Sequence, residues 1–271
     1  MPEGLGSILQ NKRMTSDRKA LTGSAFATLL LLAFMMGANH VAARFAFNNG
    51  VDVVTAVSCR STVTALVVGL LLWQQKVSFT TTSRDKKFLL IIGGLIAVQS
   101  MCLYSSVARL PVALALLAFN TYPLSTAVWA RVLYQHKAER AVLMAMPVML
   151  VGLAMALDVF GAASGLGAAA HWSQIGAGIA FALAASATFG LAMVLTQHEV
   201  AGLDGRLRTF STMGLVAVLA ISGALSFEGF HWPTAQAGWW GLAMLTFFMA
   251  PLSPSCSPYC HAWGWWAIRP S

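Results

Sequence analysis

Hydrophobic residues in this sequence gather into long apolar stretches that short polar segments separate. A helix needs about 20 apolar residues to cross the hydrocarbon core of a bilayer. Helices are favoured because lipid offers no partner for an unpaired backbone group, and the stretches are too long for the alternating strands of a membrane barrel. The pattern predicts eight membrane-spanning helices, over residues 21–43, 53–75, 88–108, 111–130, 141–157, 173–197, 209–227 and 235–252.

The composition places the chain among the membrane proteins. It is 58% hydrophobic and 10% charged, with a mean hydropathy of +0.70, whereas a soluble domain is about 45–50% apolar and about 25% charged. So few charges cannot cover a surface that faces water. We predict an all-α polytopic membrane protein embedded in the lipid bilayer. The composition excludes a disordered chain, a disulfide scaffold and a nucleic-acid-binding module.

Positively charged residues lie mainly in alternate loops. The net charge of +8 is better explained by cationic loops on the cytoplasmic side than by a polyanionic partner. Only Arg44 and Arg109 fall on the opposite side of the predicted spans. This bias predicts a cytoplasmic N-terminus. The loops that we assign to the cytoplasm hold Lys12, Arg13, Arg18, Lys19, Lys76, Arg84, Lys86, Lys87, Lys137, Arg140, Arg206 and Arg208.

A linker of small residues divides the chain into two predicted halves. Residues 161–172 contain the uncharged run GAASGLGAAA. Gly37 in the first predicted span and Gly190 in the sixth each lie in the middle of a stretch of small residues. Halves with an odd number of helices have opposite orientations, as in many transporters. We expect a cytoplasmic segment 1–20, a first repeat of five helices 21–160, the linker, an incomplete second repeat 173–252 and an atypical tail 253–271.

Four stretches of the sequence resemble the EamA-type members of the drug/metabolite transporter superfamily. They are MGANHVAARFA in span one, the early Arg60 of span two, the run YSSVARLPVALA that begins at Tyr104, and NTYP over residues 120–123. The resemblance covers spans one to five well and spans six to eight loosely. It implies ten helices in two inverted five-helix repeats. It also implies transport of small metabolites, often amino acids or related compounds, usually outward across the inner membrane.

The end of the chain departs from that family pattern. After Met249 the sequence becomes rich in proline, and Pro251, Pro254 and Pro258 stand too close together for a spanning helix. We therefore expect the last two helices of the second repeat to be missing, through truncation or a shifted reading frame. An alternative function follows from this expectation, namely a membrane remnant that transports nothing or a membrane-embedded partner subunit.

The sequence offers little material for an enzyme or a metal site. All acidic residues lie before the first predicted span, in loops or at helix ends. No HExxH or GxSxG motif and no pair of carboxylates is found. Cys256, Cys260 and His261 form C-x3-C-H, which is not a usual zinc or haem spacing. We expect neither an enzymatic activity nor a cofactor or bound metal.

Arg60 is the one strong charge inside a predicted span. An intramembrane arginine costs on the order of 2.5–3.5 kcal/mol on insertion scales, so it usually faces a cavity, a partner or an anionic substrate group. Its long side chain could instead snorkel to the outer interface. The sequence leaves these two alternatives open.

Polar side chains on spans one, three and four complete the predicted site. Any one of them could serve helix packing, but as a set they favour the lining of a cavity. Pro123 is expected to kink span four and to free backbone carbonyls, and Gly37 and Gly190 are assigned structural roles. The predicted substrate-binding residues are Arg60, Asn39, His40, Gln99, Tyr104, Asn120 and Tyr122.

These observations together predict a secondary transporter that exports a small polar metabolite by alternating access. Its partners would be the small-molecule substrate and the bilayer. The sequence leaves open whether the protein also forms a homodimer.

Overall fold

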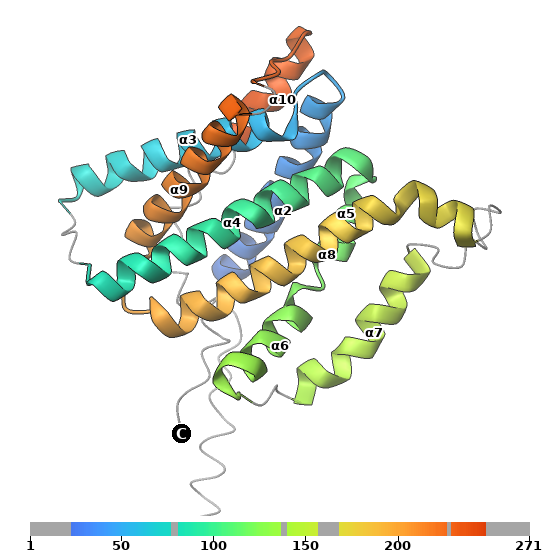
Figure 1. Ribbon diagram of the computed structural model, residues 1–271, viewed down its shortest axis with the longest axis horizontal. Helices are drawn as coiled ribbons and strands as arrows, with labels where there is room; N and C mark the ends of the chain where they lie inside the picture. Colours follow the sequence, from blue (N-terminus) through green and yellow to red (C-terminus); the bar gives the residue numbers. More distant parts are fainter. Residues whose placement is uncertain (1–22, 77–80, 137–139, 157–167, 227–228, 248–271) are drawn as a thin grey trace, which may run out of the picture. The chain divides into compact units, whose positions relative to one another are not determined.

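The structure, a computed structural model, describes residues 23–76, 81–136, 140–156, 168–226 and 229–247. All regular secondary structure in these ranges is helical (Figure 1). The chain divides into two compact units, residues 1–35 and 36–271, and the packing described below lies within the second. The helices are α2 (Gly23–Phe47), α3 (Val53–Gln74), α4 (Ser83–Arg109), α5 (Val112–Phe119), α6 (Tyr122–Tyr134), α7 (Arg140–Ala156), α8 (Ala168–Glu199), α9 (Gly205–Ser226) and α10 (Gln236–Phe247).

Each predicted span overlaps one helix, or in the case of span four two consecutive helices, over the described residues. Within the described ranges, five helical segments are long and apolar enough to cross a membrane, namely Val53–Gln74, Ser83–Arg109, Val112–Tyr134, Ile175–Glu199 and Gly205–Ser226. The prediction of an all-α polytopic membrane protein is confirmed. Helix α10 has 12 described residues. The end of the eighth predicted span and the proline-rich tail fall in residues 248–271, which lie outside the described part.

Capping side chains and proline residues mark the ends of several helices. The side chain of Asp52 accepts a hydrogen bond from the backbone N–H of Thr55 at 3.2 Å and so caps the start of α3. Thr82 and Asp85 form a capping box at the start of α4. Pro111 follows directly on the C-cap residue Leu110 of α4, because proline cannot continue a helix.

Span four is broken between α5 and α6, close to the predicted kink. Pro123 is the second residue of α6, and its ring is incompatible with an unbroken helix through the preceding turn. The hydroxyl of Thr121 donates to the carbonyl of Ala118 at 2.8 Å and lies 2.9 Å from the hydroxyl of Ser186 on α8. The protein interior thus supplies partners for polar groups at the break, as a membrane environment requires.

Close helix packing in the second unit depends on small residues. Helix α8 packs along α4, α5 and α6, while α9 packs along α3 and α4, and α10 against α3. A Cβ atom added at Gly241 of α10 would lie 3.0 Å from the backbone nitrogen of Ala46 on α2. One buried apolar cluster joins residues of α2, α3, α4, α9 and α10, with Tyr104 among them.

In an inverted repeat, corresponding helices of the two halves would make exchanged contacts. If α2, α3 and α4 correspond to α8, α9 and α10, the contact of α3 with α9 maps onto itself. The contact of α4 with α9 maps onto that of α10 with α3, and both are present. The extensive contact of α4 with α8 would map onto one of α10 with α2, and those two helices approach each other at Gly241 and Ala46. The division of the chain into two inverted repeats stays a prediction.

The two glycines that we assigned structural roles differ in their surroundings. At Gly190 an added Cβ would lie 2.8 Å from both the Cβ of Ser125 and the backbone nitrogen of Thr126, whereas at Gly37 it would meet no atom of the described residues within 4 Å. Gly190 therefore allows α6 and α8 to approach closely, and Gly37 serves no such contact.

Gly190→Ala is expected to destabilise the protein, because the new methyl group would push against the backbone of α6. We expect a loss of about 1–3 kcal/mol, the usual range for overpacking. Gly37→Ala is the matched control and should leave stability unchanged or raise it by up to about 1 kcal/mol through helix propensity. Thermal unfolding in detergent checks both variants, and equal melting temperatures would contradict the assignment.

Candidate functional site

Five of the seven predicted binding residues lie together around the side chain of Tyr104. Helix α2 provides Asn39 and His40 near its C-terminal end, α3 provides Arg60, and α4 provides Gln99 and Tyr104. Ser100 of α4 joins them, and because residues four apart share one face of a helix, it lies on the same side as Tyr104. We call this set the Tyr104 cluster: Asn39, His40, Arg60, Gln99, Ser100 and Tyr104.

Tyr104 is the centre of the cluster and only 1% exposed. Its hydroxyl accepts a hydrogen bond from Nδ2 of Asn39 at 3.2 Å. The guanidinium carbon of Arg60 lies over the ring, 5.2 Å from its centroid, within the range of a cation–π contact. The rings of His40 and Phe47 lie 5.9 and 6.0 Å away, the latter edge-on. Contacts with one aromatic ring therefore bring three helices together.

Arg60 is a half-buried cation held by neutral groups. Its Nη2 donates to the hydroxyl of Ser100 at 3.3 Å, and that hydroxyl faces Oε1 of Gln99 at 3.5 Å. Among the described residues no carboxylate lies within 4.0 Å of Arg60. The ion pair that the described residues form joins two other residues, Arg84 and Glu199. The positive charge thus lacks a counter-ion in the part of the protein that is described.

Several buried polar atoms of the cluster have no hydrogen-bond partner among the residues that the structure describes. They include Oδ1 of Asn39, Nδ1 of His40 and Nε of Arg60, and the nearby α3 hydroxyls of Ser58 and Ser61 are also unpaired. Roughly 90% or more of buried polar groups in proteins are hydrogen-bonded, so a group of unpaired ones calls for an explanation. Donor and acceptor atoms that are left open beside an uncompensated cation suit a small polar ligand.

The other two predicted binding residues lie elsewhere. Asn120 is exposed at the break in span four. Tyr122 packs with Phe119 and, edge-on at 5.1 Å, with Phe189 of α8. The structure therefore places Tyr122 in an aromatic contact between span four and α8, and neither residue touches the Tyr104 cluster. Pro123 lies at the same break, as described above.

Two residues of this region were missed by sequence reasoning. Ser100 gave no signal, because a serine in an apolar helix is common and only its contact with Arg60 distinguishes it. Arg44 gave one, since it stands on the side of the membrane that is poor in positive charge. Its Nη1 donates to the carbonyls of Val107, Ala108 and Leu110 at 2.7, 2.6 and 3.4 Å. Arg44 thus caps the C-terminal end of α4, where a positive charge is favourable.

The chemistry available at the Tyr104 cluster is charge pairing and hydrogen bonding. Within the described ranges, no three His, Cys, Asp or Glu residues gather in a way that could hold a metal ion. The cluster offers one fixed positive charge, hydroxyl and amide groups, and one imidazole. Such groups can bind and orient a small polar solute.

Comparison with known proteins gives the context for this cluster. A search of curated proteins found no significant match. The sequence model of the EamA-like transporter family matches residues 23–157. The match begins at the first residue of α2 and includes every member of the Tyr104 cluster. The chain therefore belongs to the EamA-like transporter family and is a multi-pass membrane transporter of the drug/metabolite type.

Proposed function

We propose that this protein is a secondary transporter that exports a small polar metabolite with an anionic group, an amino acid or a related compound. The observation that carries the proposal is Arg60, a cation inside a membrane helix with no carboxylate within 4.0 Å among the described residues. A charge in this position is expensive unless a partner compensates it. The carboxylate of a substrate would be that partner.

The unpaired atoms of the cluster suggest how the rest of the substrate is recognised. Nε of Arg60 is a free donor, while Oδ1 of Asn39 is a free acceptor. Nδ1 of His40 can accept as well when the imidazole carries its proton on the other nitrogen. A molecule with a carboxylate and an ammonium group matches both kinds of atom. An α-amino acid has these groups on one carbon.

Alternating access would carry the bound substrate across the membrane. In inverted-repeat transporters the substrate site lies near the bilayer midplane, and one repeat rocks against the other around it. Arg60 is the eighth residue of α3, about 11 Å along the axis from the start of the helix. Substrate would neutralise its charge and permit the movement, because an empty site would leave an uncompensated cation in the membrane.

Efflux from cells that overproduce the full chain tests this proposal. Cells are loaded with a panel of radiolabelled amino acids and related carboxylates, and the rate of loss is compared with that of cells that carry the empty vector. We expect faster efflux of at least one carboxylate-bearing compound. No change across the whole panel, with the protein present in the membrane, would overturn the exporter proposal.

The proposed orientation has its own test in the inner membrane. Two reporter enzymes are used, one active only in the cytoplasm and one active only in the periplasm. Inserted in the loop between Lys76 and Arg84, only the cytoplasmic reporter is expected to be active, because positively charged loops stay on that side. Inserted after Asn48, in the loop between α2 and α3, only the periplasmic reporter should be active. The reverse pattern would contradict a cytoplasmic N-terminus.

A further inference from the structure

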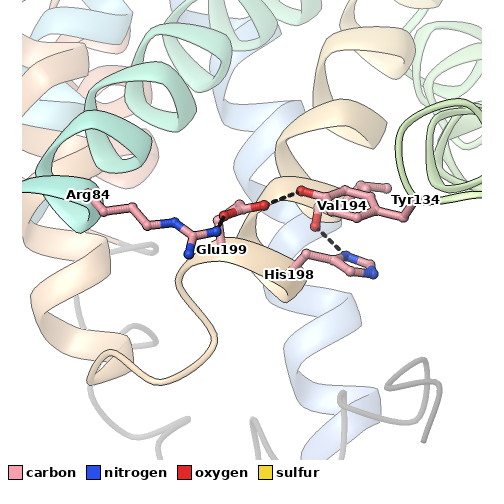
Figure 2. A network of polar contacts seen from close by, with 5 residues as sticks. All are labelled: Arg84, Tyr134, Val194, His198 and Glu199. Atoms are coloured by element: carbon pink, nitrogen blue, oxygen red, sulfur yellow. Dashed lines mark hydrogen bonds and ion pairs between the residues drawn. The ribbon is translucent and has the colours of Figure 1, made fainter. Parts of the chain in front are cut away.

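A network of charged and aromatic side chains joins the ends of three helices (Figure 2). Oε2 of Glu199 lies 2.5 Å from Nη2 of Arg84 in an ion pair. Its other carboxylate oxygen accepts a hydrogen bond from the hydroxyl of Tyr134 at 2.6 Å. Glu199 is the last residue of α8, Tyr134 is the last of α6, and Arg84 is the second residue of α4.

The position of each charge favours this pairing. A negative charge at the C-terminal end of a helix and a positive charge at an N-terminal end are both unfavourable with respect to the helix dipole. Glu199 and Arg84 have these positions in their own helices. When they pair, each charge lies beside the complementary end of the other helix. If the ion pair broke, Glu199 and Arg84 would each remain at the unfavourable end of its own helix without the other charge. Arg84 would then have only its neighbour Asp85 as a nearby negative charge.

Aromatic groups hold the phenol of Tyr134 in place. The ring of His198 is stacked on the ring of Tyr134, with centroids 3.9 Å apart and an interplanar angle of 14°. Nδ1 of His198 lies 2.9 Å from the carbonyl of Val194, one turn earlier in α8. His136, just past the end of α6, lies 5.2 Å from the ring of His198. The side chain of Glu199 is only 10% exposed, while that of Arg84 is 72% exposed.

The network connects helices from both predicted repeats. Helices α4 and α6 belong to the first repeat and α8 begins the second. The predicted orientation places the start of α4 and the ends of α6 and α8 at the cytoplasmic face, because these ends adjoin the positively charged loops. Movement of one repeat against the other would have to change the network at this face.

We propose that Arg84, Tyr134 and Glu199 form a cytoplasmic latch, which holds the two repeats together in the state seen here and opens when the Tyr104 cluster faces the cytoplasm. The inference rests on the alternating-access function proposed above. It adds a gate to that function, with Glu199 as the residue that both partners share. His198 acts as a positioning residue for Tyr134.

The test measures access to the transport path rather than transport. Thr64 lies one turn beyond Arg60 on the same face of α3 and is 5% exposed. Thr64→Cys is introduced in the full chain after Cys59, Cys102, Cys256 and Cys260 have been replaced by serine. A membrane-impermeant maleimide then reacts with inside-out vesicles, which expose the cytoplasmic face.

Opening of the latch should raise the labelling rate of Thr64→Cys from that face by severalfold. We expect this result for Glu199→Gln, Arg84→Ala and the milder Tyr134→Phe. Arg84→Ala combined with Glu199→Gln should add little to either change alone, because both remove the same ion pair. The charge exchange Arg84→Glu with Glu199→Arg should restore part of the slow labelling.

A matched control is available on α6. Arg131 is an exposed arginine in the last turn of that helix, and Arg131→Ala should leave labelling unchanged. Unchanged labelling in all three latch variants would overturn the proposal. Equal increases from both faces of the membrane would overturn it too, because they would indicate general loosening of the helices. Labelling is measured with Arg60 present and without substrate, whereas the transport proposal is tested by efflux, so failure of the transport proposal can be told from failure of the latch.

Discussion

Replacing Arg60 by alanine is expected to abolish efflux while the protein stays in the membrane at its normal level. The guanidinium is the fixed positive charge of the Tyr104 cluster, and its Nε is buried without a partner in the described ranges. Removal of one partner from a buried charged contact costs about 2–5 kcal/mol, which corresponds to a loss of at least about thirtyfold in transport at low substrate concentration. Initial efflux rates, normalised to the amount of protein in the membrane, measure the effect.

Two further variants separate substrate binding from a structural role of Arg60. Arg60→Lys keeps the charge but loses the planar fork of donors, so it should recover only part of the activity. Ser100→Ala removes the hydroxyl that holds Nη2 at 3.3 Å and should reduce efflux severalfold, because the guanidinium is then less well oriented. Normal efflux by Arg60→Ala at normal expression would end the proposal of substrate contact. Loss of the folded protein in Arg60→Ala and Arg60→Lys alike would assign a structural role instead.

Replacing Arg44 by alanine is expected to destabilise the protein strongly. Its Nη1 donates to three backbone carbonyls at the end of α4. A hydrogen bond that involves a charged group contributes about 1.5–3 kcal/mol, and the helix end adds about 0.3–1 kcal/mol. We expect the free energy of unfolding to fall by about 2–4 kcal/mol, which thermal unfolding in detergent would show.

The control for Arg44 is the other arginine at the same end of α4. Arg109 is exposed, donates to the carbonyl of Ser105 in its own helix at 2.9 Å and covers the ring of Phe181 at 4.8 Å. Arg109→Ala should therefore lower stability by less than Arg44→Ala. Equal melting temperatures for Arg44→Ala and the unmodified protein would show that water or lipid replaces the cap without loss.

Much of the helical framework could be predicted from local sequence, because the length of an apolar run and the charges that flank it are local properties. The break in span four is an example. Pro123 predicted a kink, and α6 begins one residue before this proline. The partner that the Thr121 hydroxyl finds on α8 was not predictable, since Ser186 lies 65 residues away and reaches Thr121 only after the helices have packed.

The types of residue that form the candidate site could be predicted from the sequence, but which of them lie together could be predicted only in part. Polar residues in apolar spans are conspicuous, and Asn39, Arg60 and Tyr104 were all found in this way. Their grouping depends on the approach of α2, α3 and α4, which no local pattern records. Tyr122 has the same signal, but α5 and α6 pack on α8, so its ring meets Phe189 and takes no part in the Tyr104 cluster.

The sequence by itself determined that this chain is an all-helical membrane protein, because burial in lipid depends on hydropathy summed over about 20 residues. It also determined which side chains are out of place in lipid, Arg60 above all. Only the tertiary structure decided what those side chains meet. Arg44 became the cap of α4, and Glu199 joined Arg84 across 115 residues. Such contacts depend on helix register and on close approaches such as that at Gly190, and these are properties of packed pairs of helices.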